Sequence, residues 1–492
     1  MHLFALYVEP LLVALAKGID GIEHYGEGVK VRAYVDDLVV FVSSLKDIRG
    51  ACETVMEFCD WTKARINKGK TKLLGLGTWS LDSSSPGLVA QPVRAPSGNP
   101  GVHGSIPSKC NTLHTTRTWP YEWITQVPDL KILGITFSHN IPSTIKLNWH
   151  QQSLIIQNIL IKNTHRHFTF YGRVLFIKQH VLSQLIHIAH VLPCNKTQAL
   201  LIKQKFNKFL FSKRREHPPL EVLIRPRNQG GLGAILPFQF FQSLFTRQIF
   251  KSLIHPEALE RLAAVYWLGP HLKNLLPKII LPATNPNNSS HAYFTKSLLT
   301  ITKLLKSGII TPTSSANHRA IYSHLISDIC QPGRTEKAKP DLDWQSIWRW
   351  VAKLKGKVGE LIWDFNHNQL PTMLRLKSLH LSANGECPLC NSGPETDDHL
   401  MLTCPEKSNI ILWLRIQLTK LGCLKPLSSA INGDIGTCTK KKRILLLIQA
   451  YITITWTARC NNCTPTINEL HNLWDNLHHK KHSHKISPHQ PL

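Results

Sequence analysis

Two apolar segments near the start of the chain predict a β-hairpin. Residues 29–35 read VKVRAYV and residues 38–44 read LVVFVSS, and both are rich in β-branched and aromatic side chains. Asp36 and Asp37 lie between them, and acidic residues favour turns. We therefore expect two antiparallel strands with both carboxylates at the turn.

Helical patterns flank this hairpin. Residues 3–15, LFALYVEPLLVAL, are apolar but contain Glu9 and Pro10 and lack a preceding basic segment, so they predict a buried helix rather than a signal peptide. Residues 45–67 follow a helical period. The period places four apolar positions on one face: Ile48, Cys52, Val55 and Cys59.

The pattern changes between residues 80 and 119, which are rich in Pro, Gly and Ser and show no periodicity. Such a composition predicts a loop or a disordered insert. Residues 129–138, DLKILGITFS, return to a short strand pattern.

A helical period dominates residues 145–260. Apolar residues three or four positions apart predict an amphipathic helix, and they are Val174, Ile177, Val181, Leu185, Ile188 and Leu192. GGLGA at 230–234 predicts a sharp turn, and the partly polar segment 275–340 predicts a linker. A Trp-rich segment at 343–365 opens another helical region, and the His-rich end is expected to be disordered.

The charge balance indicates a polyanionic partner. Lys and Arg number 58 against 31 Asp and Glu, a formal net charge of +27. Phosphate contacts release condensed counterions, and the 13 Trp and 26 His add stacking and amphipathic side chains. We expect RNA and DNA as partners; the alternative is that the charges only solubilise the surface.

The cysteines and apolar stretches indicate the compartment. The 12 Cys do not form the dense framework of a small secreted domain. The longest uncharged apolar stretch near the end, residues 444–458, is short for a membrane span and contains Gln449 and three Thr. We expect no membrane association, reduced thiols, and an intracellular location in the nucleus, the cytoplasm or both.

The paired aspartates are candidate metal ligands. Carboxylates held by strands can bind Mg²⁺, a hard cation that in turn binds substrate phosphates. Asp36 and Asp37 have this arrangement, although turn chemistry alone also explains an Asp-Asp pair.

A second candidate site is a structural zinc centre. Cys387, Cys390, His399 and Cys404 fit the spacing C-x2-C-x8-H-x4-C. The two-residue gap allows both thiolates to face one tetrahedral ion, and four protein ligands leave no open position for catalysis. The alternative is three reduced core cysteines and a hydrogen-bonded histidine.

Two further features carry less information. Cys460 and Cys463 form another C-x2-C near a histidine-rich tail (His478, His479, His482, His484), which is a second candidate metal site. KKKR at 440–443 fits a nuclear import signal, a phosphate contact or a solvated helix start.

An ordered series of motifs resembles LINE-type non-LTR retrotransposon reverse transcriptases. Tyr34-Val35-Asp36-Asp37 resembles the YxDD box, and residues 66–74, INKGKTKLL, resemble the next motif through Asn67 and Lys70. The LG-containing primer-grip hairpin and the thumb of the family have counterparts in residues 131–138, 172–193 and 227–239, and residues 3–15 resemble the helix after the template-binding motif. The segment around Cys387–Cys404, with Glu395-Thr396, resembles the zinc-binding domain downstream of the polymerase.

The resemblance implies RNA-directed DNA synthesis from dNTPs. It assigns Asp36 and Asp37 as Mg²⁺ ligands, Lys70 a place near the nucleotide phosphates, and the Cys387–Cys404 set to structural Zn²⁺. We expect the nucleic acid to contact aromatic, amide and basic side chains: Tyr34, Asn67, Lys203, Lys205, Lys208, Lys213, Arg214 and Arg215.

The implied fold class is α+β: a truncated palm with a small antiparallel sheet and helices, a mainly helical thumb and a small zinc-binding module. The expected domains are, in chain order, a partial palm (1–78), the insert (79–125), a primer-grip-like hairpin (126–142), the thumb and connection (143–270), a linker (271–340), the zinc-binding domain (341–425), C-terminal helices (426–477) and the tail (478–492).

The chain also departs from the family pattern. Members carry one essential aspartate on a strand well upstream of the YxDD box, and none of the carboxylates before Asp36 (Glu9, Asp20, Glu23, Glu27) has a comparable strand context. Two-metal catalysis needs carboxylates on both sides of the ions. We therefore expect this chain to be catalytically incomplete. Alternatives are a non-catalytic nucleic-acid-binding protein and a decayed element copy without selected function.

Overall fold

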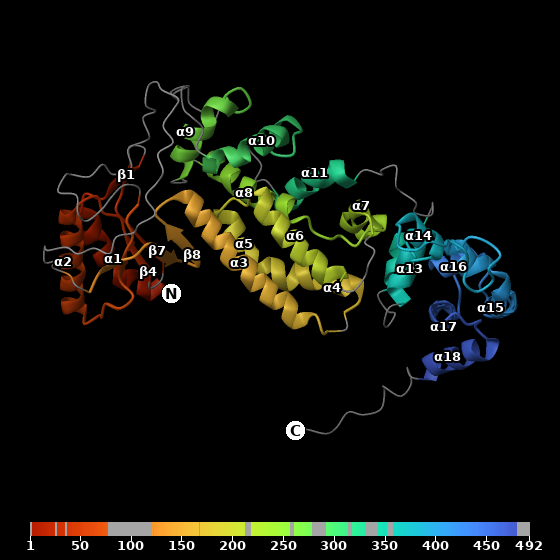
Figure 1. The fold of residues 1–492 in the computed structure, drawn as a ribbon. Helices are drawn as coiled ribbons and strands as arrows, with labels where there is room; N and C mark the ends of the chain where they lie inside the picture. Colours follow the sequence, from red (N-terminus) through yellow and green to blue (C-terminus); the bar gives the residue numbers. More distant parts are fainter. Residues whose placement is uncertain are drawn as a thin grey trace, which may run out of the picture. The chain divides into compact units, whose positions relative to one another are not determined.

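A computed structural model describes residues 2–24, 27–34, 37–76, 121, 123–166, 168–211, 218–255, 260–277, 292–312, 317–330, 342–351 and 358–479. Most of these residues are helical, and the strands are short (Figure 1). The chain divides into two compact units. Unit 1 comprises Met1–Ile155, Gln184–Leu200 and Phe238–Ser323, and unit 2 comprises Ile156–Ser183, Leu201–Pro237 and His324–Leu492.

Unit 1 begins with two helices packed together and a hairpin against them. The elements are α1 (His2–Gly18), α2 (Leu45–Thr62), β3 (Val31–Tyr34) and β4 (Asp37–Val40). Their core contains Leu11, Leu15, Ile19 and Ala51. The predicted helix face is confirmed, because Ile48 and Cys52 are buried and Val55 and Cys59 are half-buried.

The predicted hairpin at the aspartate pair is also confirmed. Strands β3 and β4 pair antiparallel with Tyr34 opposite Asp37. Strands β1 (Ile22–His24) and β2 (Glu27–Val29) form a second antiparallel pair just before it. The described strands make four separate two-stranded sheets. The predicted α+β class with small antiparallel sheets is confirmed. The strands pair only two by two and do not join into one palm sheet among the described residues.

The segments on either side of the predicted insert lie next to each other. Strand β5 (Lys72–Leu73) pairs parallel with β6 (Thr125–Gln126), and the Val127 amide donates to the Leu73 carbonyl at 2.9 Å. The hairpin β7 (Asp129–Ile132) and β8 (Ile135–Ser138) follows, as predicted, through a turn at Leu133 and Gly134 with φ of 48° and 84°. Residues 80–119 of the predicted insert lie outside the described residues.

The rest of unit 1 is helical. Its core includes Trp149, whose ring lies 4.9 Å from that of Phe241 and whose Nε1 donates to the Pro193 carbonyl. The helices that lie wholly or partly in unit 1 are α3 (Ile141–Asn163), α5 (Leu182–Val191), α8 (Pro237–Ile254), α9 (Glu260–Leu272), α10 (Ala292–Lys306) and α11 (His318–Cys330).

Helices α10 and α11 lie in the segment that we read as a linker, and that reading missed them. Ile301, Leu304 and Ile321 are fully buried, and the Tyr293 hydroxyl donates to the Val191 carbonyl at 2.7 Å. The polar and Pro-containing residues around these helices hid their short apolar faces in the sequence.

Unit 2 begins with the helices of the predicted thumb. The predicted amphipathic pattern is confirmed, because all six apolar positions are buried. They lie in α4 (Phe170–Phe176), in the π-helical segment η1 (Ile177–Val181) and in α5, which continues into unit 1, except for Leu192, which directly follows α5. The π-helical turn was not predicted. Helix α6 (Lys196–Phe211), α7 (Leu220–Ile224) and the 3-10 turn η2 (Arg227–Gln229) follow in the chain.

The C-terminal part of unit 2 is an all-helical assembly around a fully buried centre that includes Leu447, Ile448 and Tyr451. The predicted C-terminal helices are present. The elements are α12 (Trp344–Val351), α13 (Val358–Asn366), α14 (Met373–Ser378), the π-helical η3 (His399–Thr403), the 3-10 turn η4 (Pro405–Lys407), α15 (Ser408–Lys420), α16 (Leu427–Asn432), α17 (Lys441–Cys460) and α18 (Ile467–His479). Within the described residues, no helix has the length and apolar character needed to cross a membrane.

Candidate metal centre and nucleic-acid-binding residues

The four predicted zinc ligands converge. The ligand atoms of Cys387, Cys390, His399 and Cys404 all lie within 4.8 Å of one another. The Sγ atoms of Cys387 and Cys404 are 4.0 Å apart, and Cys390 Sγ lies 3.4 Å from His399 Nε2. Within the part of the chain that the structure describes, this is the only such group of three or more His, Cys, Asp or Glu residues.

The local backbone explains the convergence. The Cys387 amide donates to the Gly393 carbonyl and the Asn391 amide donates to the Cys387 carbonyl, both at 2.9 Å, so the chain turns tightly around the first two ligands. Asn391 has φ of 51°, a left-handed conformation that Asn tolerates. The short segment η3 carries His399, and the Cys404 amide donates to the His399 carbonyl at 2.9 Å. Two sharp turns thereby aim all four side chains at one point.

The donor set and its spacing fit Zn²⁺. In a tetrahedral site with Zn–S of about 2.3 Å, two sulfurs lie about 3.8 Å apart and a sulfur and a nitrogen about 3.6 Å apart. The separations of 4.0 Å and 3.4 Å agree with these values. Three thiolates and one imidazole fill the coordination sphere, so an ion here would have a structural role.

The surroundings of the ligands shift their pKa values in different directions. Burial and nearby Lys407 lower the pKa of His399, which favours the neutral imidazole needed for ligation. Burial raises the pKa of Cys404 to about 12, and Lys407 opposes this rise. A hydroxyl hydrogen bond from Ser392 reaches Cys390 Sγ at 3.0 Å.

The aspartate hairpin presents its described side chains to solvent. Tyr34 is 63% exposed at the end of β3, and Asp37 is exposed at the start of β4. Asp36, with Val35, lies outside the described residues. Strands β3 and β4 thus pair on either side of this segment, with Tyr34 opposite Asp37.

The Lys70 motif forms a compact turn. The Lys70 amide bonds both the carbonyl and the side-chain Oδ1 of Asn67, at 3.0 and 3.2 Å. Thr71 also donates its amide and hydroxyl to the Asn67 carbonyl. Asn67 thus shapes the turn, and Lys70 projects from it as an exposed cation.

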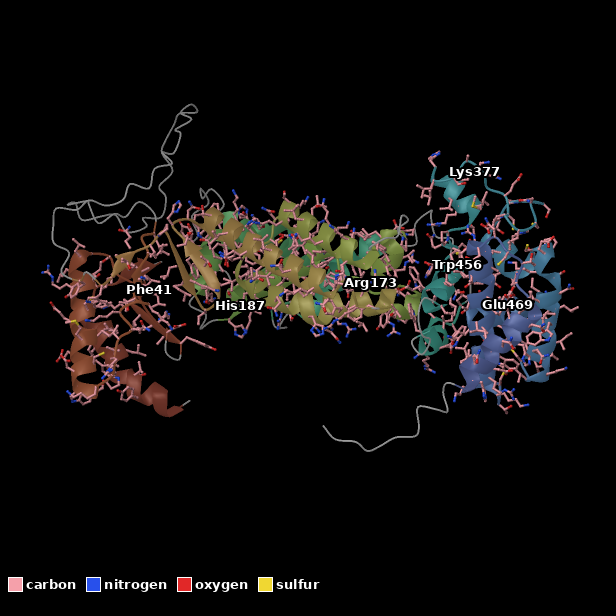
Figure 2. The ribbon with its side chains drawn as sticks, turned by 60° about the horizontal axis from the view of Figure 1, so that its bottom comes forward. Phe41, Arg173, His187, Lys377, Trp456 and Glu469 are labelled. Atoms are coloured by element: carbon pink, nitrogen blue, oxygen red, sulfur yellow. The ribbon has the colours of Figure 1, made fainter. Side chains whose placement is uncertain are left out.

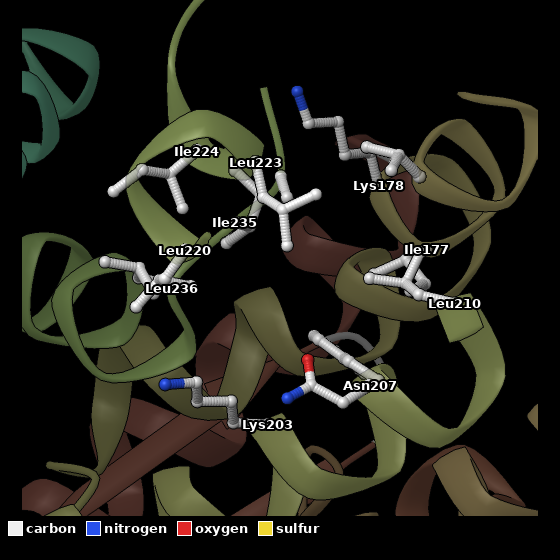
Figure 3. Close-up of a pocket in the computed structure, with 13 residues that line it drawn as sticks. Ile177, Lys178, Lys203, Asn207, Leu210, Leu220, Leu223, Ile224, Ile235 and Leu236 are labelled. Carbon is white, nitrogen blue, oxygen red and sulfur yellow. The ribbon is translucent and has the colours of Figure 1, made fainter. Parts of the chain in front are cut away.

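The predicted basic residues on α6 differ in their environments. Lys208 is exposed, Lys203 and Lys205 are half-buried, and burial lowers the pKa of Lys205. Lys203 lines a small, mainly apolar cavity of about 20 Å³ that Lys178 also borders (Figure 3). Lys213, Arg214 and Arg215 lie outside the described residues.

The two weaker sequence features, the Cys460–Cys463 pair and the KKKR segment, are exposed in the structure. Cys460 and Cys463 are exposed and belong to no metal-ligating group among the described residues. Lys441 and Lys442 are exposed at the start of α17, and the Arg443 guanidinium lies 5.3 Å from the Trp474 ring. The KKKR segment thus lies at an exposed helix start.

Buried charges beside the metal ligands were missed in the sequence. Glu395 and Lys407 are 0% and 1% exposed, and Arg459 forms an ion pair with Glu395 at 3.0 Å. In the sequence Glu395 stands out only as part of the Glu395-Thr396 motif, and no local pattern pairs it with Arg459, 64 positions away.

Comparison with known proteins identifies both regions. Residues 2–137 match the family model for reverse transcriptase (RNA-dependent DNA polymerase), and residues 329–413 match the model for the zinc-binding domain in reverse transcriptase. A search of curated proteins finds no match. The converging Cys and His ligands all lie in the second matched region. The chain therefore contains a region related to reverse transcriptases, followed by a region related to the zinc-binding domain of those proteins.

Proposed function

We propose that the chain is the palm, thumb and zinc-binding part of a LINE-type reverse transcriptase and that it binds RNA and DNA. The observation that carries the proposal is the order of the two matches: reverse transcriptase at 2–137 precedes the zinc-binding domain at 329–413. The net charge of +27 supports a nucleic-acid partner.

In this proposal Asp36 and Asp37 derive from the Mg²⁺ ligands of the polymerase, and Lys70 derives from a residue near the nucleotide phosphates. The polymerase reaction needs carboxylates on both sides of the metal pair. Among the described strands, Glu23 lies on β1, which pairs only with β2 and not with the aspartate hairpin. We therefore propose that these 492 residues alone do not extend a primer.

A primer-extension assay tests this directly. The purified chain is incubated with a primed RNA template, dNTPs and Mg²⁺, and we expect no extension. Mg²⁺-dependent extension that Asp36→Asn abolishes would overturn the proposed inactivity and support the enzyme.

Binding without catalysis is measured separately by titrating labelled RNA and DNA at several salt concentrations. We expect dissociation constants of about micromolar or tighter, with affinity falling steeply as salt rises. Cys387→Ser/Cys390→Ser should destroy binding, because the module that these ligands hold unfolds without its metal. Asp36→Asn/Asp37→Asn serves as the matched control and should leave affinity unchanged. Weak, salt-independent binding would contradict the nucleic-acid-binding function.

A further inference from the structure

Glu395 is a buried carboxylate placed between the two halves of the zinc ligand set. It follows Cys390 and precedes His399 in the chain, and its side chain is 0% exposed. Its Oε2 accepts a hydrogen bond from the Met373 amide at 2.6 Å, at the start of α14. Its own amide donates to the Gly385 carbonyl at 2.9 Å, so Glu395, which follows the first two ligands, is tied to backbone that precedes them.

Arg459 of α17 holds this carboxylate from the other side. Its Nη2 and Nε lie 3.0 and 3.2 Å from the two carboxylate oxygens of Glu395. Nη2 also donates to the Pro371 carbonyl at 2.9 Å, and the guanidinium lies 5.4 Å from the Trp456 ring. Trp456 is labelled in Figure 2. A buried ion pair is retained at low cost only when its remaining donors and acceptors are satisfied, as they are here.

The same helix contacts the second pair of ligands. Tyr451 is fully buried on α17, and its hydroxyl donates to the Met401 carbonyl at 2.6 Å. Met401 lies in η3, between His399 and Cys404. Helix α17 therefore holds the backbone near both halves of the ligand set.

Lys407 supplies a buried positive charge at the centre. It is 1% exposed, and its Nζ donates to the Leu400 carbonyl. A Zn²⁺ ion with three thiolates and a neutral imidazole has a net charge of about −1. Lys407 offsets this charge where water cannot.

We propose that α17 is an integral part of the metal centre and that Glu395, Arg459 and Tyr451 are positioning residues for the zinc ligands. Helix α17 (Lys441–Cys460) lies entirely beyond the region that matches the zinc-binding family, which ends at residue 413. The functional metal-binding domain thus extends through α17. Partners that orient metal ligands typically change affinity about 10- to 100-fold when they are mutated.

The test measures metal affinity in the full chain. Zn²⁺ is titrated in competition with a chromogenic chelator, and Co²⁺ is titrated while its absorption bands report the tetrahedral geometry. Glu395→Gln and Arg459→Met should each weaken Zn²⁺ binding about 10- to 100-fold. Because Glu395 and Arg459 act through one ion pair, the double variant should lose no more Zn²⁺ affinity than the weaker-binding of the two single variants.

Matched controls separate positioning from general effects. Glu386→Gln makes the same change in an exposed residue next to the ligand Cys387. Arg443→Met makes the same change on α17 at an arginine that also stacks on a tryptophan. Both controls should keep Zn²⁺ affinity within about twofold, well below the effect expected at the positioning residues.

Unchanged Zn²⁺ affinity in Glu395→Gln and Arg459→Met, even with a lower melting temperature, would show that the ion pair only packs the domain and would overturn the proposal. The proposal would also be overturned if the loss of Zn²⁺ affinity in the double variant equalled the product of the two single-variant losses. If Glu395→Gln fails to fold, Tyr451→Phe decides, since it keeps the buried ring and removes the hydroxyl that bonds the Met401 carbonyl. A several-fold weaker Zn²⁺ affinity in Tyr451→Phe supports the proposal, and an unchanged affinity contradicts it.

Discussion

At the scale of single residues, Asp47 shows how this basic chain uses a buried acid. It is 2% exposed at the start of α2. Its carboxylate accepts hydrogen bonds from the amides of Asp20, Gly21 and Ser43 at 2.9, 3.3 and 3.0 Å, and from the Ser43 hydroxyl at 3.0 Å. Burial raises the pKa of Asp47, but these hydrogen bonds outweigh it and place the pKa below its ordinary value. Asp47 thus joins α2 to the turn after α1.

We predict that Asp47→Ala destabilises the start of unit 1 by about 1–3 kcal/mol, because hydrogen bonds to a buried charged acceptor are lost. The lowered pKa means that Asp47 stabilises the fold above its unfolded-state pKa, about pH 4, and that this contribution is lost as pH falls through the folded-state pKa. The variant should therefore lose less stability on acidification than the wild type.

Hydrogen exchange at the Asp20 and Gly21 amides measures this prediction. Asp60→Ala, an exposed position on the same helix, is the control and should leave exchange at both amides unchanged. Equal protection in Asp47→Ala and Asp60→Ala would contradict the role assigned to Asp47.

At the scale of elements, the glycine turn after η2 fits against the Trp-rich helices. The Gly230 carbonyl accepts hydrogen bonds from Trp363 Nε1 at 2.8 Å and from the His367 ring at 2.9 Å. The rings of Trp344 and His367 stack with centroids 4.7 Å apart. A Cβ at Gly230 would lie 2.4 Å from the Trp344 ring, so only glycine permits this contact.

We predict that Gly230→Ala destabilises unit 2 more than Gly422→Ala does. Both glycines have positive φ, 84° and 83°, so both substitutions carry about 1–2 kcal/mol of backbone strain. A Cβ at Gly230 would also clash with the Trp344 ring, which should cost about 1–3 kcal/mol more. A Cβ at Gly422 meets nothing within 4 Å. Thermal unfolding followed by tryptophan fluorescence compares the two, and equal losses would show that the contact with Trp344 is unimportant.

At the scale of the whole molecule, each unit is assembled from separate chain segments. Unit 1 contains both sides of the predicted insert, and the β5–β6 pair brings them together. The hydrogen bond from the Val127 amide to the Leu73 carbonyl joins the two sides and involves no residue of the insert. Unit 1 therefore does not need the insert to join its two sides.

We predict that replacing residues 77–120 with a Gly/Ser linker of about ten residues preserves unit 1. Shortening the loop lowers its closure entropy cost by about 1 kcal/mol, so stability should stay the same or rise slightly. Hydrogen exchange at Val127 and in the β7–β8 hairpin measures the outcome. Loss of protection there would show that the replaced residues support the fold.

The sequence identified the local elements because their signals are local. Two runs rich in β-branched and aromatic residues predicted the Tyr34–Asp37 hairpin, and the helical period predicted the buried positions from Val174 to Leu192. The spacing of Cys387, Cys390, His399 and Cys404 predicted one site, and their ligand atoms converge. Helices α10 and α11 were missed because their few buried residues lie among polar ones and are recognised only through long-range packing.

The sequence alone determined the candidate ligands, the β3–β4 and β7–β8 hairpins and the helix face from Val174 to Leu192, because these signals come from the types and spacing of neighbouring residues. Only the tertiary structure decided what surrounds the metal ligands. Arg459 and Tyr451 reach Glu395 and Met401 from 64 and 50 positions away, and Lys407 is buried beside them. These distant residues come together because α17 packs against the segment from Cys387 to Cys404. A pattern of neighbouring residues does not contain this information.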